Sequence, residues 1–179
     1  DITWANDNKT FFYTKKDSVT LRSRWIVKHK LGTSSANDQI VSEEKDETFS
    51  TGIYKTKSKK FLVISSGSTL TNHYQILDAN TPDGKFKEFS PRERGIEYDI
   101  DHYNDKFYIV TNLEATNFRL METPDTKTSK ENWKEKIAHR KDTLLEGIEI
   151  FKNYLVISER ANASTLIRII NQQTGNEHY

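Results

Sequence analysis

Four short apolar runs recur along the chain at nearly the same interval, each rich in aromatic and β-branched residues. The runs are Phe11–Thr14, Phe61–Ser65, Phe107–Thr111 and Tyr154–Ser158. Their first residues lie 46 to 50 positions apart. Runs of this length and composition are typical of buried β-strands. The pattern therefore predicts one structural unit made four times.

Each run has a strand-like segment before it and another after it, separated by turn-forming residues. The preceding segments are 1–5, 49–55, 98–103 and 146–151, and the following ones are 24–29, 72–78, 117–121 and 165–170. Turns as short as Asn6–Asn8 and Asn104–Asp105 join antiparallel strands, because a parallel crossover needs a dozen or more residues. Repeats of this size and form favour an all-β chain of about four antiparallel meander blades, part of a β-propeller, over a sandwich.

The phase of the repeat assigns burial and resolves one ambiguous segment. We expect Phe61–Ile64, Phe107–Val110 and Tyr154–Ile157 to be central buried strands. Six further side chains are expected to be largely buried between blades, namely Trp4, Trp25, Ile53, Ile76, Leu120 and Ile148. The segment 129–137 fits either a short helix or an outer strand over Trp133–Ile137, and the repeat phase favours the strand.

The expected blade repeats lie near residues 1–47, 48–95, 96–143 and 144–179. Four blades form either an open arc, as part of a larger ring, or a closed four-bladed ring. An open arc exposes apolar faces on its end blades, so an isolated arc is expected to self-associate. A chain that begins and ends within its repeat is expected to be part of a longer protein.

Composition removes several classes of partner and leaves the compartment open. With 27 basic and 26 acidic residues the formal net charge is +1, which gives no reason to expect a nucleic acid or a membrane as partner. Cysteine is absent, so disulfides and thiolate metal sites are excluded. No apolar stretch approaches the ~18 residues of a membrane span, and Asp1 opens on a strand pattern rather than a signal peptide. Bacterial cytoplasm and periplasm both remain possible locations.

The chain carries no motif for catalysis, cofactor binding or metal binding. The nearest approach to a Gly-x-Ser-x-Gly nucleophile elbow is 65–68, which lacks the flanking glycines. The five histidines stand singly, without ligand spacing. The acidic stretch 43–47 has neither the spacing nor the glycine of a calcium loop and is interpreted as a solvated connection between blades. We therefore expect no catalytic, cofactor or metal residue here.

Two carboxylates recur near the start of the innermost strand of successive repeats, Glu97 and Glu146. At that position they are candidates to face the central channel of a propeller. A glycosidase using the pair is a further hypothesis, and it requires the two carboxyl groups to lie ~5 to 10 Å apart.

Nine segments spread over the whole chain resemble one known family. They are 1–7, 20–22, 28–33, 43–49, 55–59, 77–79, 91–98 (Pro91-Arg92 and Glu97-Tyr98), 101–108 and 159–168 (Glu159-Arg160 and Ile167-Arg168). In this order they resemble the N-terminal β-propeller of oligopeptidase B, or protease II, in the prolyl oligopeptidase family of serine peptidases.

That resemblance implies a seven-bladed propeller that caps an α/β-hydrolase domain of the same polypeptide. The parent enzyme is then expected to be a serine-type endopeptidase that cleaves short peptides after basic residues. The Ser-Asp-His triad belongs to the hydrolase domain, which is absent from this chain, so the fragment alone is predicted to be inactive. Its implied role is gating and substrate-size filtering. The alternative is a free-standing propeller for protein interaction. In the reading frame beyond Tyr179, three more blades followed by Gly-x-Ser-x-Gly would support the peptidase, and a stop codon would support the alternative.

A charged cluster lies in the connection between two consecutive blades. Arg92, Arg94 and Glu97 occupy such a connection, which emerges at an end of the ring. We expect this cluster, with Glu146, to be interdomain or channel-facing. The competing interpretation is that the arginines pair locally with Glu93 or Glu97.

Overall fold

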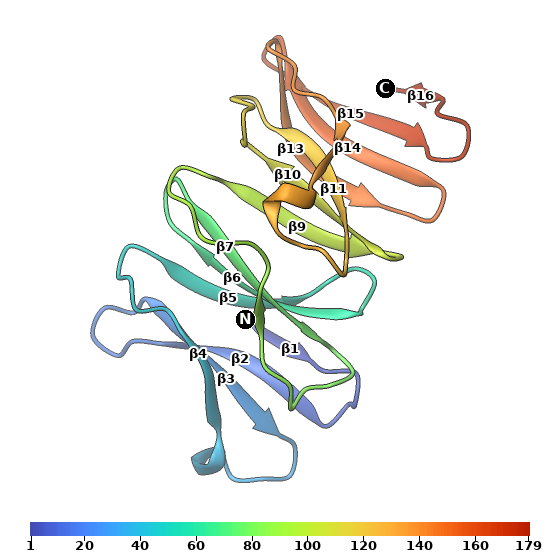
Figure 1. Ribbon diagram of the computed structural model, residues 1–179. Coiled ribbons are helices and arrows are strands. Elements are labelled where there is room, and N and C mark those ends of the chain that lie inside the picture. The colour runs from blue at the N-terminus through green and yellow to red at the C-terminus, as the bar shows by residue number, and fades with distance from the viewer. The chain divides into compact units, whose positions relative to one another are not determined.

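The computed structural model describes residues 1–179 and contains four four-stranded sheets. Each sheet consists of four consecutive strands paired antiparallel in chain order (Figure 1). The prediction of an all-β chain with four antiparallel meanders is confirmed. The chain divides into two compact units, Asp1–Gly95 and Ile96–Tyr179, each holding two of the sheets.

The first unit contains the sheets β1–β4 and β5–β8. The first sheet is β1 (Ile2–Trp4), β2 (Thr10–Lys16), β3 (Ser23–Lys30) and β4 (Gln39–Glu43), with a 3₁₀ turn at Ser35–Asn37. The second is β5 (Ser50–Lys55), β6 (Phe61–Gly67), β7 (Asn72–Asp78) and β8 (Lys87–Glu88).

The second unit contains the sheets β9–β12 and β13–β16. The first of them is β9 (Tyr98–Tyr103), β10 (Lys106–Thr111), β11 (Arg119–Pro124) and β12 (Lys134–Ile137), with a 3₁₀ turn at Lys130–Asn132. The other is β13 (Thr143–Ile150), β14 (Tyr154–Ala161), β15 (Ser164–Asn171) and β16 (Glu177–His178). The segment after Ser129 is thus a single 3₁₀ turn followed by the outer strand, as the repeat phase predicted. Neither short 3₁₀ turn has the length or apolar character to cross a membrane.

Each unit is held by an apolar core in which its two sheets contribute side chains to one cluster. In the first unit Phe12 and Ile26 of one sheet lie in the same buried cluster as Leu62 and Ile64 of the other. The second unit has an equivalent cluster, made of Tyr108, Val110, Leu120, Leu145, Ile150, Leu155 and Ile157. The second strands β6 and β10 are buried on both faces, so their central side chains are all removed from water, which explains why these two runs are apolar without alternation.

Most of the burial predictions are confirmed, and several are wrong. Leu62–Ile64 and Phe107–Val110 are buried, as are Ile53, Ile76 and Leu120. Tyr154 was predicted to be buried but is 44 % exposed, because it begins its strand at the end of the sheet. Leu155 and Ile157 are buried as predicted. The predicted core positions that are only partly buried are Trp25, Phe61, Ile148 and Val156.

Trp4 was also predicted to be buried and is 41 % exposed. Its ring contacts the ring of Phe11 at a tilt of 55°, with the centroids 5.0 Å apart. Both lie on the face of sheet β1–β4 opposite to Phe12, which faces the core of the unit. Within the first unit the only other sheet packs on the Phe12 face, so Trp4 stays accessible.

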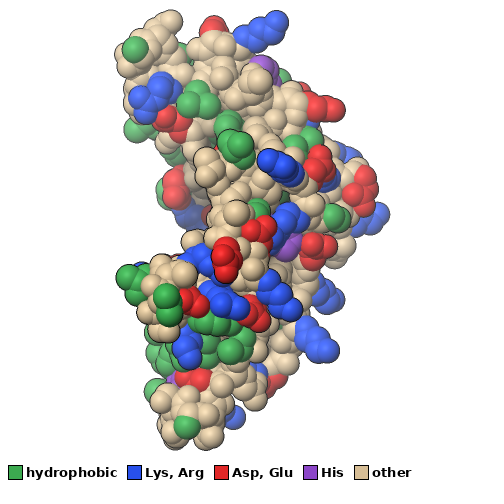
Figure 2. Space-filling view, turned by 90° about the vertical axis from the view of Figure 1, so that its left-hand side faces the viewer, with side chains coloured by type: hydrophobic (Ala, Val, Ile, Leu, Met, Phe, Trp, Pro, Cys, Tyr) green, Lys and Arg blue, Asp and Glu red, His purple; other side chains and the backbone are tan.

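Acidic and basic side chains are interspersed on the face shown in Figure 2, without a region of one sign. Some charged residues form ion pairs between neighbouring strands of one sheet. Arg24 with Glu43 and Lys106 with Glu122 are examples.

A hairpin residue anchors the chain where it leaves each of the first three sheets. In every case the residue lies between the second and third strands of a sheet, and the connection runs from that sheet's fourth strand. Arg22 holds the connection 44–49, Thr71 holds 89–97 and Asn117 holds 138–142. The side chains differ, but each makes its hydrogen bonds to main-chain atoms of the connection.

The Asn117 anchor provides a direct test. Its Nδ2 donates to the carbonyl oxygens of Arg140, at 3.2 Å, and Lys141, at 2.8 Å. We expect Asn117→Ala to lower the free energy of unfolding by about 1 kcal/mol, the usual net value of such hydrogen bonds. Urea denaturation measures this, with Thr126→Ala, an exposed loop substitution, as the control expected to stay within about 0.5 kcal/mol of the wild type. Equal stability of both variants would contradict an anchoring role.

Candidate functional site

Three loops of the first unit converge at one end of its sheets. They are the connection 44–49, the β6–β7 hairpin 68–71 and the connection 89–97 as far as Gly95. A meander brings these loops together, because the hairpin after the second strand and the exit from the fourth strand lie at the same end. Charged residues that are far apart in the sequence meet there.

Arg22 fixes the path of the first connection. Its Nη1 donates to the carbonyl oxygens of Phe49, at 2.7 Å, and Asp46, at 3.2 Å. Its Nη2 donates to the carbonyl oxygen of Glu44 at 3.1 Å. One guanidinium thus satisfies three main-chain acceptors, a use to which its five fixed donors are well suited.

Glu44 is a buried carboxylate paired with Arg92. Its side chain is 8 % exposed, and its Oε2 lies 2.5 Å from Arg92 Nη2. The Asp46 N–H donates to Glu44 Oε1 at 3.0 Å. Burial alone raises the pKa of this carboxyl, but the Arg92 and Asp46 hydrogen bonds and the Arg92 charge lower it by more. The pKa of Glu44 therefore lies below its ordinary value of 4.5.

Arg92 also packs on an aromatic ring. Its guanidinium carbon lies 4.1 Å from the centroid of Phe49, whose side chain is buried. A cation over an aromatic face is attracted by the ring quadrupole, and Arg is well suited to this stacking. The charge of Arg92 is thus paired with Glu44, and the flat face of its guanidinium packs on the Phe49 ring.

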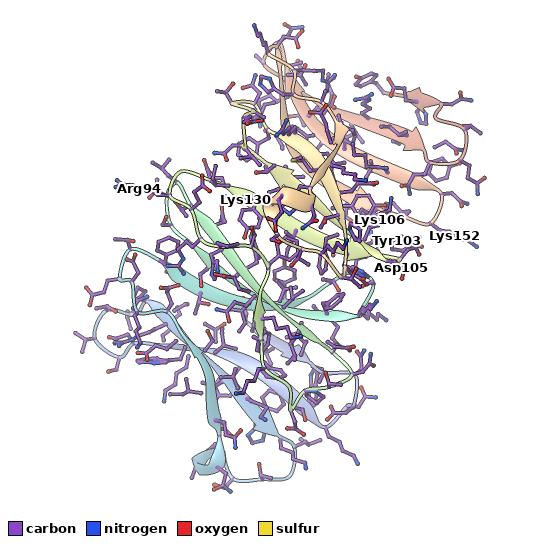
Figure 3. The ribbon with its side chains drawn as sticks, viewed as in Figure 1. Arg94, Tyr103, Asp105, Lys106, Lys130 and Lys152 are labelled. Atoms are coloured by element: carbon purple, nitrogen blue, oxygen red, sulfur yellow. The ribbon has the colours of Figure 1, made fainter.

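A cavity of about 470 Å³ opens beside this pair. Phe49, Leu70, Asp46, Arg92 and Arg94 contribute to its lining, together with the hydroxyl-bearing residues Thr48, Ser68, Thr69 and Thr71. Arg94 projects outward from its loop (Figure 3) and has no hydrogen bond or ion pair within the chain. The site therefore combines one paired arginine, one unpaired arginine and several hydroxyl groups.

Asp46 is the negative group of this cavity. Its Oδ1 accepts hydrogen bonds from the Thr48 Oγ1, at 2.7 Å, and the Thr48 N–H, at 2.9 Å. Both hydrogen bonds lower the pKa of Asp46 below its ordinary value, and the bond from the Thr48 hydroxyl has the larger effect. The positive charges of Arg92 and Arg22 lower the pKa further. Asp46 is consequently ionised at neutral pH.

The four residues singled out in the sequence have different surroundings. Arg92 pairs with Glu44 rather than with Glu93 or Glu97. Glu97 belongs to the second unit, where its Oε1 accepts from Asn112 Nδ2 at 3.3 Å. Glu146 accepts from Arg160 Nε at 2.7 Å. Only Arg94 has no partner.

Glu44 is the site residue that sequence reasoning missed. The acidic stretch 43–47 was interpreted as a solvated connection, which is wrong for Glu44 because Arg92 makes its burial favourable. A signal existed in the spacing. Glu44 and Arg92 are 48 positions apart, which is the interval of the repeat, so they occupy corresponding places in successive connections.

The second unit also contains a buried acidic residue. Glu159 is fully buried and forms ion pairs with Arg140 and Arg168. Arg168 reaches further to Glu177, with Nη2 2.5 Å from Oε2. The pairs join the connection before β13 to strands β14, β15 and β16, so this network is structural. In neither unit do three or more His, Asp or Glu side chains gather as metal ligands would.

Comparison with known proteins identifies the family of the chain. Dipeptidyl aminopeptidase BI of Pseudoxanthomonas mexicana is 40 % identical over 171 residues, covering 95 % of this chain and 24 % of that protein. Protease 2 of Moraxella lacunata is 32 % identical over 168 residues, covering 93 % of the chain and 24 % of that protein.

A solved structure of oligopeptidase B from Leishmania major superposes with a TM-score of 0.88 at 29 % identity, over 98 % of this chain and 25 % of that one. The chain thus spans about a quarter of the length of the relatives it matches. The family model of the prolyl oligopeptidase N-terminal beta-propeller domain matches residues 1–178. The chain belongs to this family of peptidase propeller domains.

Proposed function

We propose that this chain is the gating and substrate-size-filtering part of a seven-bladed propeller in a serine oligopeptidase. The observation that carries the proposal is the family match over residues 1–178 in relatives about four times as long. The rest of such a protein has room for three further blades and for an α/β-hydrolase domain with the catalytic serine. This chain then contributes scaffold and gate, and its partners are that hydrolase domain and short peptides.

The propeller acts in this proposal by restricting access. A ring over an active site admits extended short peptides and excludes folded proteins, because a folded domain cannot pass or approach closely enough. Each of the residues Arg92, Arg94, Glu97 and Glu146 is proposed to face the hydrolase domain or the channel. Among these side chains Arg94 has its charge free for such a contact, whereas Arg92 already holds Glu44.

The substrate preference proposed for the full-length enzyme is cleavage after Arg or Lys. The relative named Protease 2 and the structural relative named oligopeptidase B support an endopeptidase. The relative named dipeptidyl aminopeptidase supports a second candidate, the release of dipeptides from the amino terminus.

One experiment distinguishes the two activities. The full-length protein is incubated with a short peptide that carries an internal Arg, once with an acetylated and once with a free amino terminus, and the products are identified by mass spectrometry. Cleavage after Arg is the expected result, with no cleavage when the same sequence lies inside a folded protein. Products only from the unacetylated peptide, two residues at a time, would favour the aminopeptidase. Absence of hydrolysis in every case would remove the peptidase proposal in favour of a free-standing interaction module.

A further inference from the structure

The cavity next to Arg94 has the features of a small binding site. At about 470 Å³ it is within the usual range of ligand pockets, roughly 300 to 1,000 Å³. Phe49 forms an apolar part of its wall, and Leu70, 62 % exposed, lies at the β6–β7 hairpin that borders it. An exposed leucine beside a buried phenylalanine offers apolar contact to whatever enters.

The charges of the cavity fit an anion with a single negative charge. The Arg92 charge is neutralised by Glu44, which leaves Arg94 as the unpaired cation. Ionised Asp46 lines the same cavity and repels a second negative charge. A phosphate group or a diacid is therefore disfavoured, whereas one carboxylate matches the planar fork of a guanidinium.

The hydroxyl groups extend this match to a peptide main chain. Thr71 Oγ1 accepts the N–H of Gly95 at 3.0 Å and thereby fixes the loop that carries Arg94. The Thr69 hydroxyl makes no hydrogen bond within the chain and lines the cavity. It is thus free to bind an amide next to the carboxylate.

We propose that this cavity binds the carboxyl-terminal end of a short peptide. Arg94 binds the terminal carboxylate, Thr69 contacts the last amide, and Phe49 with Leu70 contacts apolar parts of the terminal residues. Asp46 disfavours an acidic terminal side chain. The assignment rests on the proposed function, because it requires peptides to reach this end of the propeller in the full-length enzyme. Short peptides always carry their free carboxylate within a few residues of the cleaved bond, which a long chain does not.

The test compares peptides that differ only at the carboxyl terminus. For the full-length enzyme, kcat/KM is measured on one Arg-containing peptide as the free acid and as the amide. We expect the wild type to favour the acid about tenfold, the low end of the contribution of one charge-assisted hydrogen bond at a site open to water. Arg94→Gln should remove this preference, with the loss on the acid only.

Lys45→Gln is the matched control, since Lys45 lies in the first connection, outside the cavity, and its loss also removes one positive charge. It should keep the acid preference. Equal rates on acid and amide in the wild type would overturn the proposal, as would an Arg94→Gln variant that slows both peptides alike, which would instead assign Arg94 to a contact with the hydrolase domain.

A second measurement separates this inference from the peptidase proposal. Binding of the acid and amide peptides to the full-length protein is followed by calorimetry after its reactive serine has been blocked. The proposed site is supported, even if turnover is absent, when the wild type binds the acid peptide roughly tenfold more tightly than the amide and Arg94→Gln binds both equally. Turnover without any acid preference in either assay sinks the cavity assignment and leaves the peptidase intact.

Discussion

Replacing Glu44 by alanine is expected to lower the free energy of unfolding by about 3 kcal/mol. The substitution leaves the Arg92 guanidinium against Phe49 without its counter-charge and the Asp46 N–H without its acceptor. Removing one partner of a buried pair costs about 3 to 5 kcal/mol, and the lower end applies because Arg92 is about one-third exposed. Chemical denaturation measures the change. The exposed Glu47→Ala, in the same connection, is the control and should stay near wild type.

The Glu44 contribution should also depend on pH in one direction. A carboxyl whose pKa is lowered on folding stabilises the fold above its ordinary pKa, and this stabilisation disappears as the pH falls through the folded value. The wild type should therefore exceed Glu44→Gln in stability at neutral pH, and the difference should shrink as the pH falls below 4.5. A difference that grows on acidification would contradict the pairing of Glu44 with Arg92.

Replacing Arg168 by alanine is expected to cost about 3 kcal/mol in the second unit. Glu159, fully buried, would keep only Arg140 as a partner, and Glu177 would lose its partner. Removing one of its two partners leaves Glu159 with less compensating positive charge, which is costly for a carboxylate that is fully buried. Urea denaturation should show the loss, whereas Arg160→Ala, which breaks an exposed pair with Glu146, should cost less than about 1 kcal/mol.

The double variant Glu159→Met with Arg168→Met tests whether buried charge is the cause, because it removes the buried carboxylate and leaves unpaired only Arg140 and Glu177, which are partly exposed. Replacing a buried ion pair by apolar residues is often neutral. We therefore expect the double variant to regain much of the stability lost in Arg168→Ala. A double variant less stable than Arg168→Ala would show that the network contributes through its hydrogen bonds and shape instead.

The strands were predictable because their signal is local. The run 107–110 is apolar at every position, so it predicted a strand buried on both faces, and it is one. Burial failed where it depends on what covers a face. Trp4 has an aromatic side chain typical of a core, but the sheet that packs within its unit lies on the opposite face.

Arg92 and Arg94 could be singled out from the sequence, but their pairing could not be predicted from it. Arg92 and Arg94 were named because they lie in a connection between repeats, where the structure places a cavity. The sequence gives them the same local character, yet one is bound to Glu44 and the other has no partner. That difference depends on Glu44, which lies one repeat earlier in the sequence. The burial of Glu44 depends in turn on Arg92. The pairing of Arg92 and the burial of Glu44 therefore cannot be predicted from the residues next to them in the sequence.

The hairpin anchors determine where this domain tolerates recombination between relatives. Arg22, Thr71 and Asn117 hold the chain that leaves their own sheet, so a crossover placed within a connection separates an anchor from part of the main chain it binds. A crossover inside the first strand of the next sheet, at β5 or β13, keeps the anchor and its connection from one parent. Because the three anchors differ in chemistry, a mismatched pair would not be rescued by the corresponding residue of another repeat. The segment that can be exchanged between relatives therefore runs from the first strand of one sheet into the first strand of the next, rather than coinciding with one sheet.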